Sequence, residues 1–338
     1  MENFLSVCDV PVALCFFNRP EQLTQVFTCI KMAKPTQLFL IQDGARDNRI
    51  EDVENINKCR AIVSDIDWDC DVKRNYSEEN LGCGMRIYSG ITWAFTYVDR
   101  LIILEDDCVP SRSFFPFCEV ILEKYKMDQR MGMISGMNHL EVYDKIPYDY
   151  FFATQGSIAG WATWKRMWDY IDYQLGFLEN DNTIRLLDNY FDKNKQLSNP
   201  IRRGQQLRRI IRDGGKLSSW SYSFGIEVLL QSTLIIVPKY NLMSNIGIAQ
   251  ESAHSPTSLK YLPKRKRKLY NLKLFDFTFP LKHPEHVIED IEYNGLVIKF
   301  MRTNYFERIE TIIRRIVFGD TKGLIHGVKR HLGKRKIG

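Results

Sequence analysis

The sequence predicts an α/β fold with a mostly parallel, Rossmann-like central sheet flanked by helices, and a basic helical extension at the C-terminal end. Apolar runs at residues 11–17, 38–41 and 101–104 alternate with segments whose apolar residues recur at helical spacing. These runs do not alternate apolar with polar residues, which is typical of parallel strands buried on both faces. The chain has 338 residues and is 44% apolar, which is enough for a large core.

The expected elements follow one another as strand, helix and strand. Pro20 suits the first position of the first helix, and Ser111 or Ser113 suits the cap of the fourth. Residues 141–158 are aromatic and irregular, and two polar helices meet near residue 199. In chain order, the strands are expected at 11–17, 38–41, 69–76, 101–104, 131–135 and 234–238, and the helices at 20–30, 51–64, 87–97, 113–125, 176–215 and 284–317.

The net charge of +6 belongs to the C-terminal end. Residues 301–338 hold ten Lys or Arg and three Asp or Glu, a net +7, so the other 300 residues sum to −1. This distribution indicates a local contact with a phosphate-rich surface and not a protein devoted to nucleic acid. Apolar residues on one face of 306–317 suit docking on the rest of the enzyme or on an anionic bilayer, and an ordinary surface helix is the alternative.

The composition also bears on the compartment. No stretch reaches the roughly 20 apolar residues of a membrane-spanning helix, and residues 1–5 do not begin a signal peptide. We therefore expect a cytoplasmic protein, with the C-terminal segment as a peripheral contact to the inner face of the membrane. All eight cysteines lie between Cys8 and Cys118 without a Cys-x-x-Cys pair, which predicts free thiols.

The main candidate site follows the strand at 101–104, which runs directly into Glu105, Asp106 and Asp107. Acids at the carboxyl end of a parallel strand lie where ligands bind in open α/β sheets. Clustered carboxylates repel one another unless a cation compensates, so this pattern favours a divalent-metal site shared with a phosphorylated substrate. A solvated acidic turn is the alternative.

Other candidate residues end neighbouring strands at the same edge. Arg19 follows the first strand, where a phosphate would be met, and Asp43 is either a nucleotide contact or a plain turn residue. The segment 82–87 lacks the third glycine of the dinucleotide fingerprint, but its glycines and Arg86 can still approach a phosphate. His254 is a candidate metal ligand, although a lone histidine in a loop is most often solvated.

Aromatic residues gather between positions 161 and 170. Such a cluster is either a core wedge or a platform for stacking a sugar. Core packing suits most of these side chains, and Gly160-Trp161 is the pair that we expect nearest a ligand.

With these pieces assembled, the chain resembles GT-A-fold glycosyltransferases that use nucleotide-diphospho-sugars, in particular bacterial relatives of the family-2 transferases and of N-acetylglucosaminyltransferase I. The resemblance covers about residues 10–255. The matching segments, in the family's order, are Phe16-Phe17-Asn18-Arg19-Pro20, Asp43-Gly44, Asn80-Leu81-Gly82, Leu104 to Pro110 with Phe114-Phe115, Gly160 to Trp164, and Pro238 to Gly247.

The resemblance implies roles for these residues. Asp107 is the expected direct ligand of Mn²⁺ or Mg²⁺, within the metal and diphosphate motif 105–107. Gly160 and Trp161 would line the acceptor side. The expected contacts to the nucleotide-sugar are Phe17, Arg19, Asp43, Asn80, Arg86, Glu105 and Asp106. The activity implied is an inverting, metal-dependent transfer of a sugar to a glycan or lipid-linked acceptor, as in surface polysaccharide synthesis.

The chain departs from its relatives where they carry the catalytic base, beside a tryptophan of the later segment. Here residues 217–223 contain serines around Trp220 and no carboxylate. The nearby acids Asp213 and Glu227 are the substitutes that we consider, with Glu227 better placed about two helical turns after Trp220.

The resemblance also implies a division of the chain. We expect a GT-A domain over 1–260, made of a nucleotide-sugar half (1–135) and an acceptor half (136–260), followed by the extension 261–338. Three other functions stay open: a sugar-nucleotide pyrophosphorylase, a sugar-nucleotide-binding protein with little or no transferase activity, and a non-catalytic RNA-binding module. The first usually has a glycine-rich loop after its first strand, which residues 16–20 lack, and the last is disfavoured because no RNA-binding strand motif is recognisable.

Overall fold

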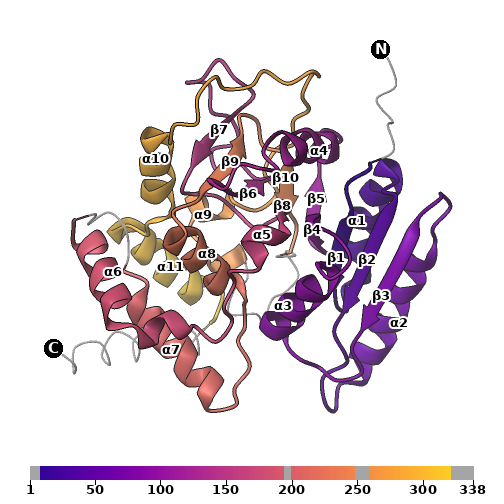
Figure 1. Cartoon of the computed structure of the whole chain (residues 1–338). Coiled ribbons are helices and arrows are strands. Elements are labelled where there is room, and N and C mark those ends of the chain that lie inside the picture. The colour runs from indigo at the N-terminus through magenta and orange to yellow at the C-terminus, as the bar shows by residue number, and fades with distance from the viewer. Residues whose placement is uncertain (1–7, 194–198, 248–258, 321–338) are drawn as a thin grey trace.

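A computed structural model describes residues 8–193, 199–247 and 259–320 (Figure 1). Its central sheet has eight strands in the order β3-β2-β1-β4-β8-β6-β9-β7. These strands are β1 Val12–Phe16, β2 Gln37–Gln42, β3 Asp71–Tyr76, β4 Arg100–Glu105, β6 Met131–Ser135, β7 Tyr150–Ala153, β8 Trp161–Trp164 and β9 Leu234–Pro238.

Parallel pairing dominates one half of the sheet, where β3, β2, β1 and β4 all run in one direction. In the other half β6 and β9 keep that direction, while β8 and β7 run against it. From β1 the chain moves outward to β2 and β3, and then returns to add β4 on the other side of β1. The boundary between β1 and β4 is therefore a topological switch point of the sheet.

Helices lie on both faces of this sheet (Figure 1). A separate two-stranded ribbon pairs β5 (Cys108–Pro110) with β10 (Met243–Asn245). The helices are α1 Pro20–Ala33, α2 Ile50–Ser64, α3 Cys83–Ala94, α4 Phe114–Lys124, α5 Lys165–Trp168, α6 Asp181–Lys193, α7 Ile201–Arg212, α8 Ser221–Leu230, α9 Lys264–Arg267, α10 Ile291–Met301 and α11 Tyr305–Val317, with 3₁₀ turns at Gly176–Glu179 and Leu259–Tyr261. The predicted α/β class, with a mostly parallel sheet flanked by helices, is confirmed.

Each buried strand contributes side chains to two hydrophobic clusters, one on each face of the sheet. In β1, Val12 and Leu14 belong to the cluster that also contains α1 and α4, whereas Ala13 and Cys15 belong to the cluster that contains α3 and α8. Side chains alternate along a strand, so an unbroken apolar run is what a strand covered on both faces requires. The packing thus explains why the sequence shows no alternation.

Several elements differ from the expectation. Residues 150–153, within the segment expected to be irregular, form β7 at the edge of the sheet. The helix expected over 284–317 is two helices, because Asn304 caps α11 through a capping box with Glu307. Ser113 precedes α4, but its hydroxyl accepts a hydrogen bond from the Phe277 backbone N–H and does not cap the helix.

Residues beyond 260 contribute to the same core as the sheet. Leu272 and Leu281 are buried in one cluster, and Tyr293 and Val297 in the other. The expected domain boundary at residue 260 stays a prediction. The eight cysteines are free thiols. Over the described ranges, no helix combines the length and the apolar character needed to cross a membrane.

Candidate functional site

The switch point brings the loops after β1 and β4 together. Cys15 pairs in register with Glu105, and the backbone N–H of Asp106 donates to the carbonyl of Cys15 at 3.0 Å. Both strands end at the same edge of the sheet, so Arg19 and the acids 105–107 meet there. The sequence predicted this meeting from the two strand ends.

Arg19 joins two of the three carboxylates. Its Nη1 donates to Asp107 Oδ2 at 3.0 Å, and its Nη2 forms an ion pair with Asp106. The backbone N–H of Phe17 donates to the other oxygen of Asp106 at 3.1 Å. The side chain of Asp106 is 3% exposed and that of Asp107 is 14% exposed. Asp106 therefore holds the loop after β1 in place through Phe17 and Arg19, and Asp107 is the more accessible of the two acids.

Glu105 has a different environment from its neighbours. In the described part of the chain, no side chain or backbone group hydrogen-bonds to its carboxylate. Burial, with repulsion from Asp107 and Asp106, raises the pKa of Glu105 to about 8, although Arg19 opposes the shift. Burial also raises the pKa of Asp106, again against the attraction of Arg19.

Residues from far along the chain complete the surroundings of Asp107. Asn245, the last residue of β10, lies with its Nδ2 3.3 Å from Asp107 Oδ1, and the Ile246 N–H donates to the Asp107 carbonyl at 2.8 Å. A Cβ added at Gly247 would clash with the Asp107 carboxylate. A larger residue at position 247 would therefore displace the Asp107 carboxylate from its present place. The sequence does not predict this contact of 245–247 with Asp107, because it depends on the β5–β10 pairing.

The acid cluster fits one kind of metal binding. Within the described ranges, no three His, Cys, Asp or Glu side chains come together as a metal cluster. Mg²⁺ commonly takes one or two protein carboxylates and completes its coordination with substrate phosphates and water. Asp107 suits that role, and the Arg19 guanidinium beside it suits the phosphate oxygens. His254, the other predicted ligand, lies outside the described residues.

Asp43, Asn80 and Arg86 hold loops together at the same edge. Asp43 accepts hydrogen bonds from the backbone N–H groups of Leu81 at 2.8 Å and Gly82 at 2.9 Å. Asn80 Nδ2 donates to the Gly44 carbonyl at 2.9 Å. Arg86 is buried, and its Nε donates to the Gln42 carbonyl at 3.1 Å. These polar groups find partners inside the protein, and their contact with a nucleotide stays a prediction.

A second polar network, beside Phe17, is not predicted from the sequence. Asp52 is buried at the start of α2 and accepts from Asn18 Nδ2 at 2.7 Å and from Arg46 Nε at 2.6 Å. The Arg46 guanidinium lies 5.6 Å from the centre of the Phe17 ring. Hydrogen bonds from Arg46 lower the pKa of Asp52 to about 2. In the sequence Asp52 looks like an ordinary acid in the first turn of a helix, so only the fold reveals this role.

The aromatic cluster lies in the core. Trp161 is 0% exposed, and its ring stacks on Trp220 with 5.4 Å between centroids. Phe224 packs against it at 4.8 Å. Gly160 adopts a positive φ of 61° directly before it, where a Cβ would clash with Met243. In this structure Trp161 presents no free ring face to a ligand, and the acceptor-side role of Gly160 and Trp161 stays a prediction.

Of the two acids considered as catalytic base, Asp213 is exposed at the end of α7, and Glu227 is buried in α8. Burial raises the pKa of Glu227, against a hydrogen bond from Gln231. Neither acid hydrogen-bonds to residues 105–107. The segment before α8 does reach the site edge, because the Gly84 N–H in the first turn of α3 donates to the Leu217 carbonyl at 3.2 Å.

No protein-family model matches the chain, and no curated protein matches it. Among solved structures, it overlays on an apo UDP-glucose pyrophosphorylase with a TM-score of 0.35 and 9% identity, over 70% of this chain and 93% of that one. An inositol-1-phosphate CTP transferase from T. maritima gives 0.35 and 9%, over 79% and 96%. A UDP-glucose pyrophosphorylase complexed with UDP-glucose gives 0.23 and 11%, over 43% and 63%. These TM-scores are too low to assign a family or to transfer a substrate.

Proposed function

We propose that the protein is a glycosyltransferase of the GT-A type, which moves a sugar from a nucleoside-diphosphate donor to a glycan or lipid-linked acceptor. One observation carries the proposal: Arg19 and Asp107 meet at the switch point of the sheet, 3.0 Å apart. A guanidinium and an accessible carboxylate at this position suit a diphosphate and its divalent cation.

The residues divide the work by their surroundings. Arg19 donates hydrogen bonds to the diphosphate, and Asp106 keeps Arg19 in place. Asp107 would hold the Mn²⁺ or Mg²⁺, and the bound ion would offset the negative charge that develops on the departing diphosphate. The Asp52–Arg46 network supports the Phe17 loop, against which the nucleoside lies.

Substitution of Asp107 tests the proposal. A panel of sugar nucleotides is first screened for thermal stabilisation of the protein with and without Mn²⁺. Asp107→Asn keeps the side-chain shape and removes the charge, so we expect it to abolish the Mn²⁺-dependent part of donor affinity in calorimetry. Asp47→Asn, at an exposed position, is the matched control.

The products distinguish the candidate reactions. Release of a nucleoside diphosphate identifies a transferase, whereas synthesis of a sugar nucleotide from a nucleoside triphosphate and a sugar phosphate identifies a pyrophosphorylase. Unchanged metal-linked donor affinity in folded Asp107→Asn protein would reject the assignment of this site.

A further inference from the structure

Helix α11 has its polar side turned inward and its apolar side turned to solvent. Glu307 is buried, and Arg314 and Arg315 are half-buried. The apolar face, by contrast, is between 37% and 79% exposed and consists of Tyr305, Phe306, Ile309, Ile312, Ile313, Ile316 and Val317. Contiguous exposed apolar surface of this kind marks an interaction site.

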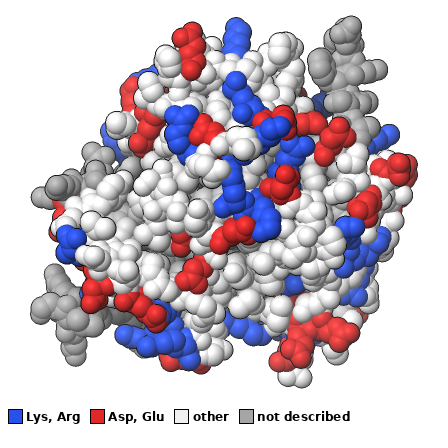
Figure 2. Space-filling view, viewed as in Figure 1, with Lys and Arg blue, Asp and Glu red and all other residues white. Residues whose placement is uncertain are grey.

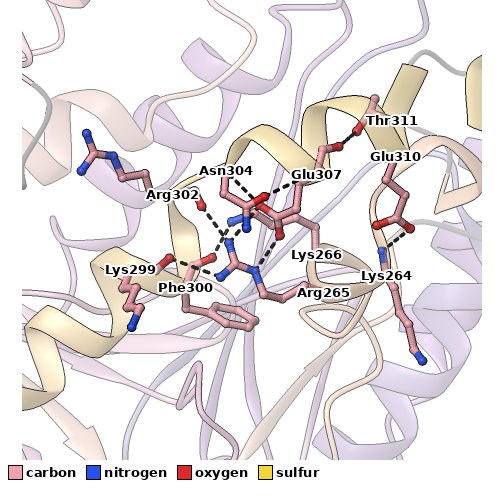
Figure 3. A network of polar contacts seen from close by, with 10 residues as sticks. All are labelled: Lys264, Arg265, Lys266, Lys299, Phe300, Arg302, Asn304, Glu307, Glu310 and Thr311. Carbon is pink, nitrogen blue, oxygen red and sulfur yellow. Dashed lines mark hydrogen bonds and ion pairs between the residues drawn. The ribbon is translucent and has the colours of Figure 1, made fainter. Parts of the chain in front are cut away.

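Polar contacts hold α11 in this orientation (Figure 3). The Arg265 guanidinium donates to both oxygens of Glu307, at 2.6 and 2.9 Å. The Lys264 N–H donates to Glu310 at 2.9 Å, and Asn304 forms a capping box with Glu307. Glu307 and Glu310 on the buried side of the helix thus bind it to α9, and the capping box fixes where the helix begins. These hydrogen bonds and ion pairs fix the orientation in which the apolar side faces solvent.

We propose that this face docks on an anionic lipid bilayer. The α11 face is amphipathic, and thirteen residues of helix are about 20 Å long, which suits a helix lying in the membrane interface. Arg302, which follows α10, and Arg308, within α11, are exposed. Residues 321–338 add six Lys or Arg and no Asp or Glu, so the positive charge continues along the sequence. Basic residues next to an apolar helix face attract anionic headgroups.

The charge near the apolar face also favours an anionic bilayer over a second copy of the chain as its binding partner. A second copy would bring its own exposed Arg302 and Arg308 to the shared interface, and like charges oppose such packing. An anionic bilayer complements both the charge and the apolar character. This inference does not depend on the reaction proposed above.

Flotation of the full-length protein with vesicles tests it. We expect binding to vesicles of phosphatidylcholine and phosphatidylglycerol, much weaker binding to phosphatidylcholine alone, and release of bound protein by high salt. The triple variant Ile309→Ser, Ile312→Ser, Ile316→Ser should lower the partition coefficient at least about tenfold, because it removes apolar groups that enter the bilayer. A matched control, Ile50→Ser, Val53→Ser, Met127→Ser, changes three exposed apolar residues elsewhere and should bind as the wild type does.

A charge variant supplies a second test that does not alter the apolar face. Arg302→Gln with Arg308→Gln should weaken binding to the anionic vesicles and leave the residual binding to neutral vesicles unchanged. Wild-type protein that does not float with anionic vesicles would overturn the proposal, as would equal flotation of the triple variant. Light scattering tests whether a second copy covers the face instead. If the wild type is a dimer, the triple variant is a monomer and neither binds vesicles, the face is a dimer interface.

Discussion

Three consecutive carboxylates in this protein have three different surroundings. Asp106 accepts hydrogen bonds from Arg19 and the Phe17 N–H, and Asp107 accepts from Arg19 and Asn245. The Glu105 carboxylate has no hydrogen-bond partner among the residues that the structure describes. Repulsion among them is offset by the single guanidinium of Arg19. Asp107 is the more exposed partner of Arg19, so a ligand reaches its carboxylate more readily than that of Asp106.

The proposed reaction also needs a general base, for which Glu227 is the candidate. We expect Glu227→Gln to lower the transfer rate by roughly 10²–10⁴-fold, which is typical of a lost general base, and to leave donor affinity unchanged. Asp213→Asn, which changes an exposed acid at the end of α7, is the control and should have little effect. Steady-state kinetics with a true acceptor measures both variants. Full transfer by Glu227→Gln would place the base elsewhere.

Asp52 makes stability depend on pH. Its pKa is about 2 in the folded protein and about 3.9 in an unfolded chain, so its stabilisation is fully present above about pH 4 and is lost as the pH falls toward 2. Asp52→Asn should lower the free energy of unfolding at neutral pH by about 1–3 kcal/mol, since it leaves Arg46 and Asn18 one neutral acceptor oxygen in place of a carboxylate. This difference should shrink between about pH 4 and 3 in urea titrations. A constant difference over that range would contradict the assignment.

At the scale of elements, strand ends carried most of the predictive information. The strands β1, β2 and β4 were recognisable because their residues are apolar on both faces, and parallel strands place Arg19 beside 105–107. Contacts between distant elements were not recognisable: β7 has a short aromatic sequence and pairs with β9, and Asn245 reaches Asp107 only because β10 pairs with β5. Periodicity is a local signal, and a single sequence carries no sign of such pairings.

The anchoring of α11 can be tested by one substitution. Glu307→Gln weakens the ion pair with Arg265 and the capping box together. We therefore expect faster amide exchange across 305–317 and a free energy of unfolding that is lower by about 1–2 kcal/mol. Glu292→Gln is the control, because Glu292 pairs with Lys145 at an exposed surface, where such pairs contribute little. Hydrogen-exchange mass spectrometry measures both. Unchanged exchange in Glu307→Gln would show that other contacts hold the helix.

At the scale of the whole molecule, the C-terminal part belongs to the core. Tyr293 is fully buried, and its ring lies 4.6 Å from that of Phe151 on β7. Charges of both signs are interspersed on the face shown in Figure 2. The apolar packing of Tyr293 adds to the polar contacts that join the C-terminal part to the rest of the protein.

Two truncations examine that cohesion. A chain of residues 1–260 lacks Leu272, Leu281, Tyr293 and Val297, each of which fills a buried position. We expect it to lose its near-ultraviolet circular dichroism and its cooperative thermal transition, because several losses of a few kcal/mol each exceed the usual stability of a domain. A chain of residues 1–320 retains these side chains and should unfold cooperatively. Cooperative unfolding of the shorter chain would instead support an independent domain over 1–260.

The pairing of β6 with β9 also matters while the protein is being synthesised. Met131 pairs with Leu234, and Phe151 packs against Tyr293. The early strands therefore leave the ribosome long before these partners have been synthesised. Domains generally fold as units as they emerge, and long-range pairings close late. A nascent chain halted before residue 290 would carry an open aromatic cluster, which is the kind of surface that chaperones bind.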